Sequence, residues 1–344
     1  MITKLTTAHS HHNVCSLPVI FTMTDENQSD EAVAPVDTPF DAPDADIILR
    51  SSDGADIRTY KLILSLVSPV FRSMLTLPQP ADETATSSTP PIIIMQEDKH
   101  TLEKLLLHCY PGYYNGISLD SLDDIKVVVA AATKYDMQAV LEHIRKWMVT
   151  SPLFATNPWV FYAMSCLQGW EAEARLAAFN IIKGQDLYWG SDHYVPELEG
   201  LNAGSYYRLT TYHARCGAAA RDSTRNLECL GTLLSRSCMD RCYQSNCLKV
   251  RLRFGTHDFP NVPSWFQDYL HAVGEELVLR PSVSTVMDSK LLTKALKEAG
   301  SCPTCCSRLS VLPELRDLFV SNVAEAVSKV ELEFAPPPPK TTSE

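Results

Sequence analysis

"KLILSLVSPVFRSML", residues 61–75, is the stretch that decides the expected fold of this chain. Its apolar residues recur at helical spacing, yet Pro69 lies near the middle, where it would remove a backbone hydrogen bond and clash with the preceding turn. Serine is a favoured N-cap and proline is favoured at the first helical position, so Ser68-Pro69 predicts a helix start. We therefore expect two short helices, about 60–67 and 69–76, which meet at a corner and face one core.

A β-hairpin is expected directly before this corner. In "ADIILRSSDGADIRTY" (45–60), two apolar runs flank Asp53-Gly54, a pair that supplies the positive φ angles of a tight turn. After the corner, "IIIM" (92–95) is short, apolar and β-branched, which is typical of a buried strand.

Three longer helices are expected after that strand. "EDKHTLEKLLLHCYPG" (97–112) has an apolar face and should end at Pro111-Gly112. "SLDDIKVVVAAATKYDM" (121–137) opens with a capping pattern from Ser121 to Asp124, and Asp136 is the predicted cap of the next helix. The order hairpin, two helices, strand and three helices predicts an α+β domain, a small β-sheet covered by a helical bundle.

These pieces, in this order, resemble the BTB/POZ domain. The Ser-Pro-x-Phe corner of that family is present as Ser68, Pro69, Val70 and Phe71, whereas its usual His-Lys is Tyr60-Lys61 here. The resemblance implies the BTB/POZ fold, an α+β fold, over residues 44–150.

The chain after the domain resembles the helical region that follows it in a large set of fungal BTB proteins. The stretches that carry this second resemblance are "NPWVFYAMSCLQGWEAEARLAA" (157–178) and "LNAGSYYRLTTYHARC" (201–216). We expect a mainly α-helical C-terminal region, with one buried helix face formed by Ala163, Leu167, Trp170, Ala174 and Ala178.

The composition divides the chain into five segments. The N-terminal segment is polar and acidic with little periodicity, so it is expected to be disordered, and Met23 is an alternative start to Met1. The expected segments are a disordered tail (1–43), the BTB/POZ domain (44–150), a helical linker region (151–220), a helical cysteine-containing module (221–335) and a second disordered tail (336–344).

The resemblance implies a protein–protein interaction adaptor and not an enzyme. Domains of this family form symmetric homodimers, and a two-fold interface needs a self-complementary apolar patch. Burial in the monomer core is the alternative role for all five candidate residues of the first two helices. The candidate interface residues are Leu62, Leu66, Val67, Val70 and Met74.

A second role within the same class is that of a substrate receptor in a cullin-based ubiquitin ligase. Some relatives dock a cullin scaffold through a hydrophobic-x-acidic element, and Leu122-Asp123-Asp124 has that pattern. The pattern has little specificity, and helix capping explains Asp124 better, so the receptor role stays an alternative.

Six of the eleven cysteines fall between Cys238 and Cys306. Two closely spaced pairs, Cys238 with Cys242 and Cys302 with Cys305, predict one structural Zn²⁺ held by four thiolates. Cys247 or His257 could replace one member. The competing interpretations are buried reduced cysteines and, in another functional class, a metal- or thiol-dependent enzyme built on these residues.

Charge, hydropathy and motifs restrict the classes of partner and of function that the sequence allows. The net charge is -11 and Lys and Arg do not cluster, so a nucleic-acid partner is not expected. No apolar run approaches the ~18 residues of a membrane helix, so a membrane partner is not expected either. Phosphate-binding and hydrolase motifs are absent from the sequence, which favours a non-enzymatic protein. The resemblance implies protein partners, and the expected location is intracellular, cytoplasmic or nuclear.

Overall fold

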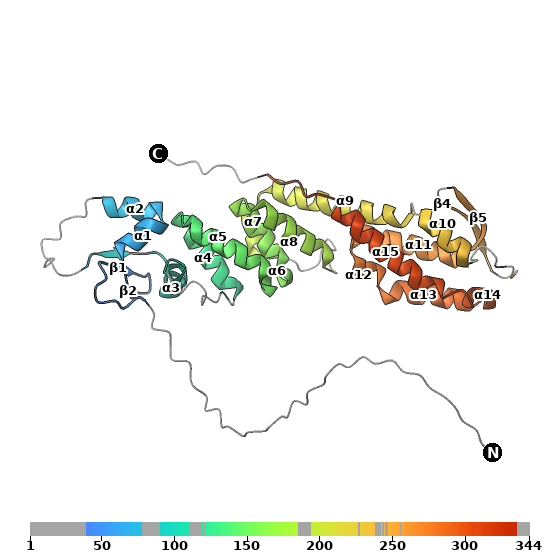
Figure 1. Ribbon diagram of the computed structural model, residues 1–344, viewed down its shortest axis with the longest axis horizontal. Helices are drawn as coiled ribbons and strands as arrows, with labels where there is room; N and C mark the ends of the chain where they lie inside the picture. Colours follow the sequence, from blue (N-terminus) through green and yellow to red (C-terminus); the bar gives the residue numbers. More distant parts are fainter. Residues whose placement is uncertain are drawn as a thin grey trace, which may run out of the picture.

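The computed structural model describes residues 39–77, 90–110, 119, 121–184, 194–225, 228–237, 242, 244, 247–254 and 256–335. Apart from residues 39–43, both predicted disordered tails lie outside these ranges, as does Pro111-Gly112. The helices and strands are arranged along a long axis, with a small sheet at one end and a hairpin at the other, and the helices Ser264–Leu279 and Val311–Ser328 pack back alongside the helix Ala203–Arg225 (Figure 1).

The sheet has three strands in the order β2-β1-β3. The central strand β1 pairs antiparallel with β2 and parallel with β3, with Leu49 opposite Ile57 on one side and Ile93 on the other. Gly54 has a φ of 86°, so the predicted hairpin and its glycine-dependent turn are confirmed. The strands are β1 (Ile47–Arg50), β2 (Asp56–Thr59) and β3 (Ile92–Ile94).

The prediction that 92–95 is a buried strand is wrong for two of its isoleucines. Ile92 and Ile94 are exposed, whereas Met95 is buried and Ile93 only packs against the core. Successive side chains of a strand point to opposite faces, and β3 is an edge strand, so three consecutive isoleucines cannot all face one core.

The predicted corner is confirmed as α1 (Lys61–Val67) followed by α2 (Pro69–Thr76). The Ser68 hydroxyl accepts a hydrogen bond from the Phe71 N–H at 3.0 Å and donates one to the Tyr135 carbonyl at 2.5 Å. The rings of Phe71 and Tyr135 stack with their centroids 4.7 Å apart. The corner is therefore fixed to the C-terminal end of the helix Leu122–Lys134, whose C-cap is Tyr135.

Three longer helices follow the sheet along the chain and pack on one another in order. The predicted cap at Ser121 is confirmed, because its hydroxyl accepts from the Asp124 N–H. Asp136 does not cap the next helix, since the N-cap is Met137. Asp136 has a φ of 50° in the tight connection between the last two helices, a backbone conformation that Asp tolerates better than most residues. These helices are α3 (Lys99–Leu107), α4 (Leu122–Lys134) and α5 (Gln138–Thr150).

Residues 157–178 form two helices and not the single buried face that was predicted. Gly169, with a φ of 74°, ends the first, and Trp170 is the N-cap of the second. Leu167 is consequently exposed, although the other four residues of the predicted face are buried. The elements here are α6 (Pro152–Thr156), α7 (Pro158–Gln168), α8 (Glu171–Lys183) and the 3₁₀-helix η2 (Pro196–Gly200).

The long helix α9 (Ala203–Arg225) joins the middle of the molecule to its C-terminal part and packs against α11 (Ser264–Leu279) and α15 (Val311–Ser328) (Figure 1). The predicted boundary at residue 220 therefore falls inside a helix. The last helix, α15, ends at Ser328. The remaining helices are α10 (Glu228–Ser237), α12 (Val283–Val286), α13 (Ser289–Gly300) and α14 (Pro303–Cys306).

The C-terminal region also contains a two-stranded hairpin that the sequence did not predict. Strands β4 (Lys249–Phe254) and β5 (His257–Pro263) pair antiparallel, and the Arg251 guanidinium makes an ion pair with Asp258 across them. Pro260 and Pro263 argue against a strand by sequence rules, but a two-stranded hairpin has only edge strands, where proline is tolerated.

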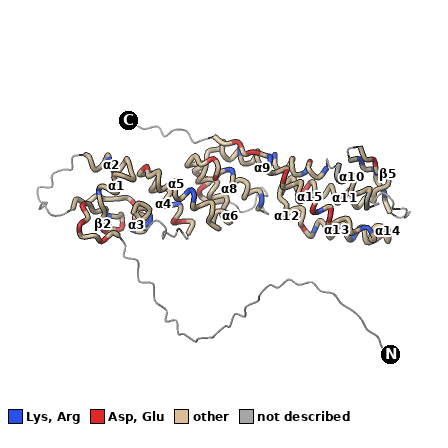
Figure 2. Tube along the Cα trace, viewed as in Figure 1, with Lys and Arg blue, Asp and Glu red and all other residues tan. Residues whose placement is uncertain are grey.

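Surface charges of both signs are mixed along the described chain (Figure 2). Among the helices that the structure describes, none combines the length and apolarity needed to cross a bilayer.

Candidate functional sites

The five predicted interface residues separate into two groups in the structure. Leu62 and Leu66 on α1 are each 69% exposed. The other three, Val67, Val70 and Met74, are partly buried and pack against the core. The structure therefore leaves two leucines of the predicted patch available to a partner.

The position of these leucines follows from the way α1 is held. Residues four apart lie on one side of a helix, so Leu62 and Leu66 share a side while Leu64 is buried in the core. The N-cap residue Tyr60 gives no side-chain cap, and the Asp46 carboxylate accepts from the Lys61 N–H at 2.7 Å instead. We call the surface formed by Leu62 and Leu66 the α1 face.

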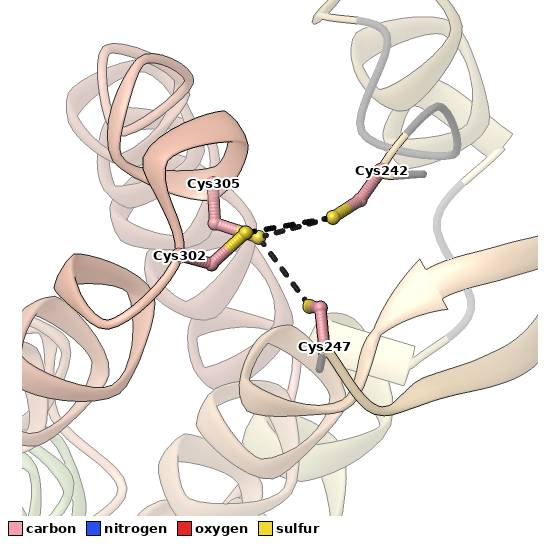
Figure 3. Close-up of side chains that lie close together, drawn as sticks. All are labelled: Cys242, Cys247, Cys302 and Cys305. Atoms are coloured by element: carbon pink, nitrogen blue, oxygen red, sulfur yellow. Dashed lines mark hydrogen bonds between the residues drawn. The ribbon is translucent and has the colours of Figure 1, made fainter. Parts of the chain in front are cut away.

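Four cysteines from two distant parts of the chain meet in the C-terminal region (Figure 3). The sulfur atoms of Cys242, Cys247, Cys302 and Cys305 all lie within 4.8 Å of one another. The Cys242 sulfur is 3.7 Å from that of Cys302 and 3.8 Å from that of Cys305, and the Cys247 sulfur is 3.7 Å from that of Cys305. We call this group the cysteine cluster.

Short elements position three of the four cysteines. Cys302 is the N-cap of α14 and Cys305 lies within it, with Pro303 at the first helical position. Cys247 lies just before β4. The carbonyl of the next residue, Leu248, accepts a hydrogen bond from the Ser264 N–H at 2.9 Å. The element on each side of the cluster is therefore fixed by its own backbone hydrogen bonds.

Three of the four predicted ligands belong to the cluster, with Cys247 as the fourth member. Cys238 lies outside the described residues. His257, the other alternative, is not in the cluster; its ring stacks on Phe259 and lies against Gly231 of α10. The spacing Cys242-x₄-Cys247 is one residue longer than the predicted pair, so the sequence offered no reason to prefer it.

Most of the cluster is buried. Cys242, Cys302 and Cys305 are buried and Cys247 is half-buried. Burial raises the pKa of Cys305 and of Cys247. At Cys302 a hydrogen bond from the backbone N–H of Cys305 outweighs burial and lowers the pKa of the thiol to about 7.

One buried polar group adjoins the cluster and was not predicted. The indole N–H of Trp265 belongs to a side chain that is 5% exposed, and it makes no hydrogen bond of ordinary geometry. Its effect on Cys305 is to lower the pKa of that thiol, although burial outweighs it. The indole N–H therefore favours a negatively charged sulfur at this position.

The comparison with protein families bears on the first of these two sites. Residues 41–152 match the family model of the BTB/POZ domain. This part of the chain is a BTB/POZ domain. The match includes the sheet and α1 to α5, and extends the predicted range of 44–150 by a few residues. No curated protein matches the chain.

The BTB/POZ domain assigns the chain a general role in protein–protein interaction, and it contains the α1 face. The cysteine cluster begins at Cys242, far beyond the end of the BTB match at residue 152. The two sites therefore belong to separate parts of the chain.

A thiol close to the BTB sheet lacks the properties of a nucleophile. Burial raises the pKa of Cys109 to about 12, and its sulfur donates to the Leu105 carbonyl at 3.6 Å. Burial also lowers the pKa of the adjacent His108 to about 4. The two residues are sequence neighbours, but their environments favour a neutral thiol and a neutral imidazole.

Proposed function

We propose that the protein is a non-enzymatic adaptor whose BTB/POZ domain pairs with a second copy of the chain through the α1 face. The exposure of Leu62 and Leu66 carries this proposal. Two leucines on one side of a short helix expose apolar surface that a partner would remove from water, at roughly 25 cal/mol per Å². A two-fold axis through α1 would place the same residues of both copies in contact.

The polar groups beside the BTB sheet support an absence of catalysis there. A shallow hollow is lined by Glu97, Asp98 and Lys134, among other residues. Lys134 is 2.6 Å from Glu97, and Asp98 caps α3 by accepting from the Thr101 N–H at 2.8 Å. These groups satisfy one another and hold the fold, which leaves none of the three as a free acid or base.

The oligomeric state of the full chain tests the proposal. In analytical ultracentrifugation the wild type should sediment as a dimer, and the double variant Leu62→Asp/Leu66→Asp as a monomer. Leu296→Asp, which changes an exposed leucine of α13, is the matched control and should stay dimeric. A circular dichroism spectrum equal to that of the wild type shows that the double variant is folded.

A wild type that is monomeric at high micromolar concentration overturns dimerisation. A double variant that is folded and still dimeric overturns the α1 face as the interface. The control excludes a general effect of adding carboxylates to the surface.

The alternative within this class is a substrate receptor of a cullin-based ubiquitin ligase. In the Leu122-Asp123-Asp124 element, Asp123 is exposed, but Asp124 accepts from His100 at 2.7 Å and lies 3.6 Å from Lys104. These contacts tie α4 to α3, so the Asp124 carboxylate is already engaged within the domain. Capture of a purified cullin scaffold by the wild type, and its loss in Asp123→Lys, would favour the receptor.

A further inference from the structure

We propose that Cys242, Cys247, Cys302 and Cys305 together bind one Zn²⁺ ion, which ties the β4–β5 hairpin to α14. This proposal is independent of the adaptor role, because the cluster lies outside the BTB/POZ domain. It replaces Cys238 of the sequence prediction with Cys247.

The distances between the sulfur atoms match a zinc site. A tetrahedron with Zn–S bonds of about 2.3 Å has sulfur atoms about 3.8 Å apart along its edges. Three edges of the cluster measure 3.7, 3.7 and 3.8 Å, and every pair is within 4.8 Å. A disulfide would bring its two sulfurs to about 2.05 Å, much closer than any of these three separations.

The donor set determines the chemistry of the bound ion. Four thiolates fill a tetrahedral zinc site, so no position remains for a water molecule or a substrate. The cluster therefore supports a structural ion, in contrast to the metal-dependent enzyme considered from the sequence. Binding requires the thiols to lose their protons, and the ion compensates the resulting negative charge.

Trp265 is an independent observation that points to a charged ligand at the same place. Its buried indole N–H needs an acceptor, because a buried donor without one is costly. A zinc-bound thiolate at Cys305 would be a better acceptor than a neutral thiol. Such donors around a metal site commonly orient and stabilise its ligands.

The ion would join elements that have few other connections. The hairpin packs on α10 and α11, whereas α14 packs on α13. Cys242 and Cys302 are 60 positions apart, and a metal that closes a long loop restricts the unfolded chain strongly. The hairpin has two strands and α14 has four residues, so neither is expected to be stable alone.

Metal analysis of the purified full chain tests the proposal. Inductively coupled plasma mass spectrometry should find about one Zn²⁺ per chain in the wild type, and native mass spectrometry should show the same adduct. Cys247→Ser and Cys305→Ser should each lose most of the zinc. Cys306→Ser, next to Cys305 but exposed, is the matched control and should retain it.

Cys238→Ser distinguishes the two possible ligand sets. Retention of zinc in this variant together with loss in Cys247→Ser supports the cluster, whereas the reverse result overturns it. Replacement of zinc by Co²⁺ should give the visible absorption of a tetrahedral cobalt–thiolate centre, a readout that does not depend on the stability of any variant.

Three results for the wild type would overturn the proposal. One is a chain without metal whose four thiols all react with an alkylating reagent. The second is a pair of disulfides in protein purified under reducing conditions. The third is an iron content that accounts for the four cysteines in place of zinc. None of these results affects the test of dimerisation.

Discussion

At the scale of single residues, Ser68 shows how one side chain decides a local structure. Its hydroxyl caps α2 through the Phe71 N–H, and the same group donates to the carbonyl of Tyr135 at the end of α4. A cap is worth about 1 kcal/mol, and a buried partner left unpaired costs about 1–3 kcal/mol. Ser68 therefore fixes the start of a helix and its position in the core.

His108 predicts a pH-dependent loss of stability. It is buried at the end of α3, neither ring nitrogen has a hydrogen-bond partner, and His143 and Lys104 add positive charge nearby. Burial and these charges lower the pKa of His108 from 6.5 to about 4. Between these values the unfolded chain binds more protons than the folded chain, so stability falls as the pH falls through this window.

The free energy of unfolding, measured with urea between pH 4 and pH 7, checks this prediction. The contribution of His108 should be complete above pH 6.5 and should decline by up to about 3 kcal/mol towards pH 4. His108→Leu removes the titrating group, so it should flatten this part of the curve. Equal pH profiles for the wild type and the variant would contradict the assignment.

At the scale of elements, Gly217 allows α9 and α11 to approach closely. A Cβ atom at this position would lie 2.5 Å from the carbonyl oxygen of Val278, which belongs to the backbone of α11. Alanine favours a helix over glycine by about 1 kcal/mol, but a clash with backbone in a packed core costs about 1–3 kcal/mol and can be relieved only if the helices move apart.

Gly217→Ala should therefore destabilise the protein, by about 1–2 kcal/mol in chemical denaturation. Gly300→Ala is the matched control, since a Cβ atom there, at the end of α13, meets no atom within 4 Å. It should leave stability unchanged or raise it by up to about 1 kcal/mol. A gain in the free energy of unfolding for both variants would show that helix propensity, and not helix packing, controls position 217.

Local rules predicted the elements whose ends are determined by local chemistry. The Ser68-Pro69 corner, the turn at Gly54 and the cap at Ser121 each depend on neighbouring residues, and all three are confirmed. The β4–β5 hairpin depends on pairing between strands, so its two prolines were misleading. The break at Gly169 was missed because alanine and aromatic residues continue the apolar pattern on both sides of it.

The sites show the same division between local and distant information. Helical spacing placed Leu62 and Leu66 on one side of α1, but exposure depends on which surfaces the rest of the domain covers. The C-x-x-C pair at Cys302 and Cys305 was recognisable from its spacing. The choice of Cys247 as their partner depends on the approach of β4 to α14, and spacing alone does not contain that information.

At the scale of the whole molecule, the BTB/POZ domain and the cysteine cluster lie at opposite ends, and α9 extends between the middle and the far end (Figure 1). If zinc ties the hairpin to α14, its removal should loosen only that end of the molecule.

Incubation of the full chain with a strong zinc chelator should speed amide hydrogen exchange in residues 247–263 and 302–306, because loss of the ion releases a long loop. Exchange in β1 and β2 of the BTB sheet should not change, since their contacts lie within the domain. Hydrogen-exchange mass spectrometry before and after chelation, with Cys306→Ser as a control that behaves like the wild type, measures this directly. Faster exchange throughout the chain would show that the two ends unfold together, and unchanged exchange at the hairpin would show that the cluster does not hold it.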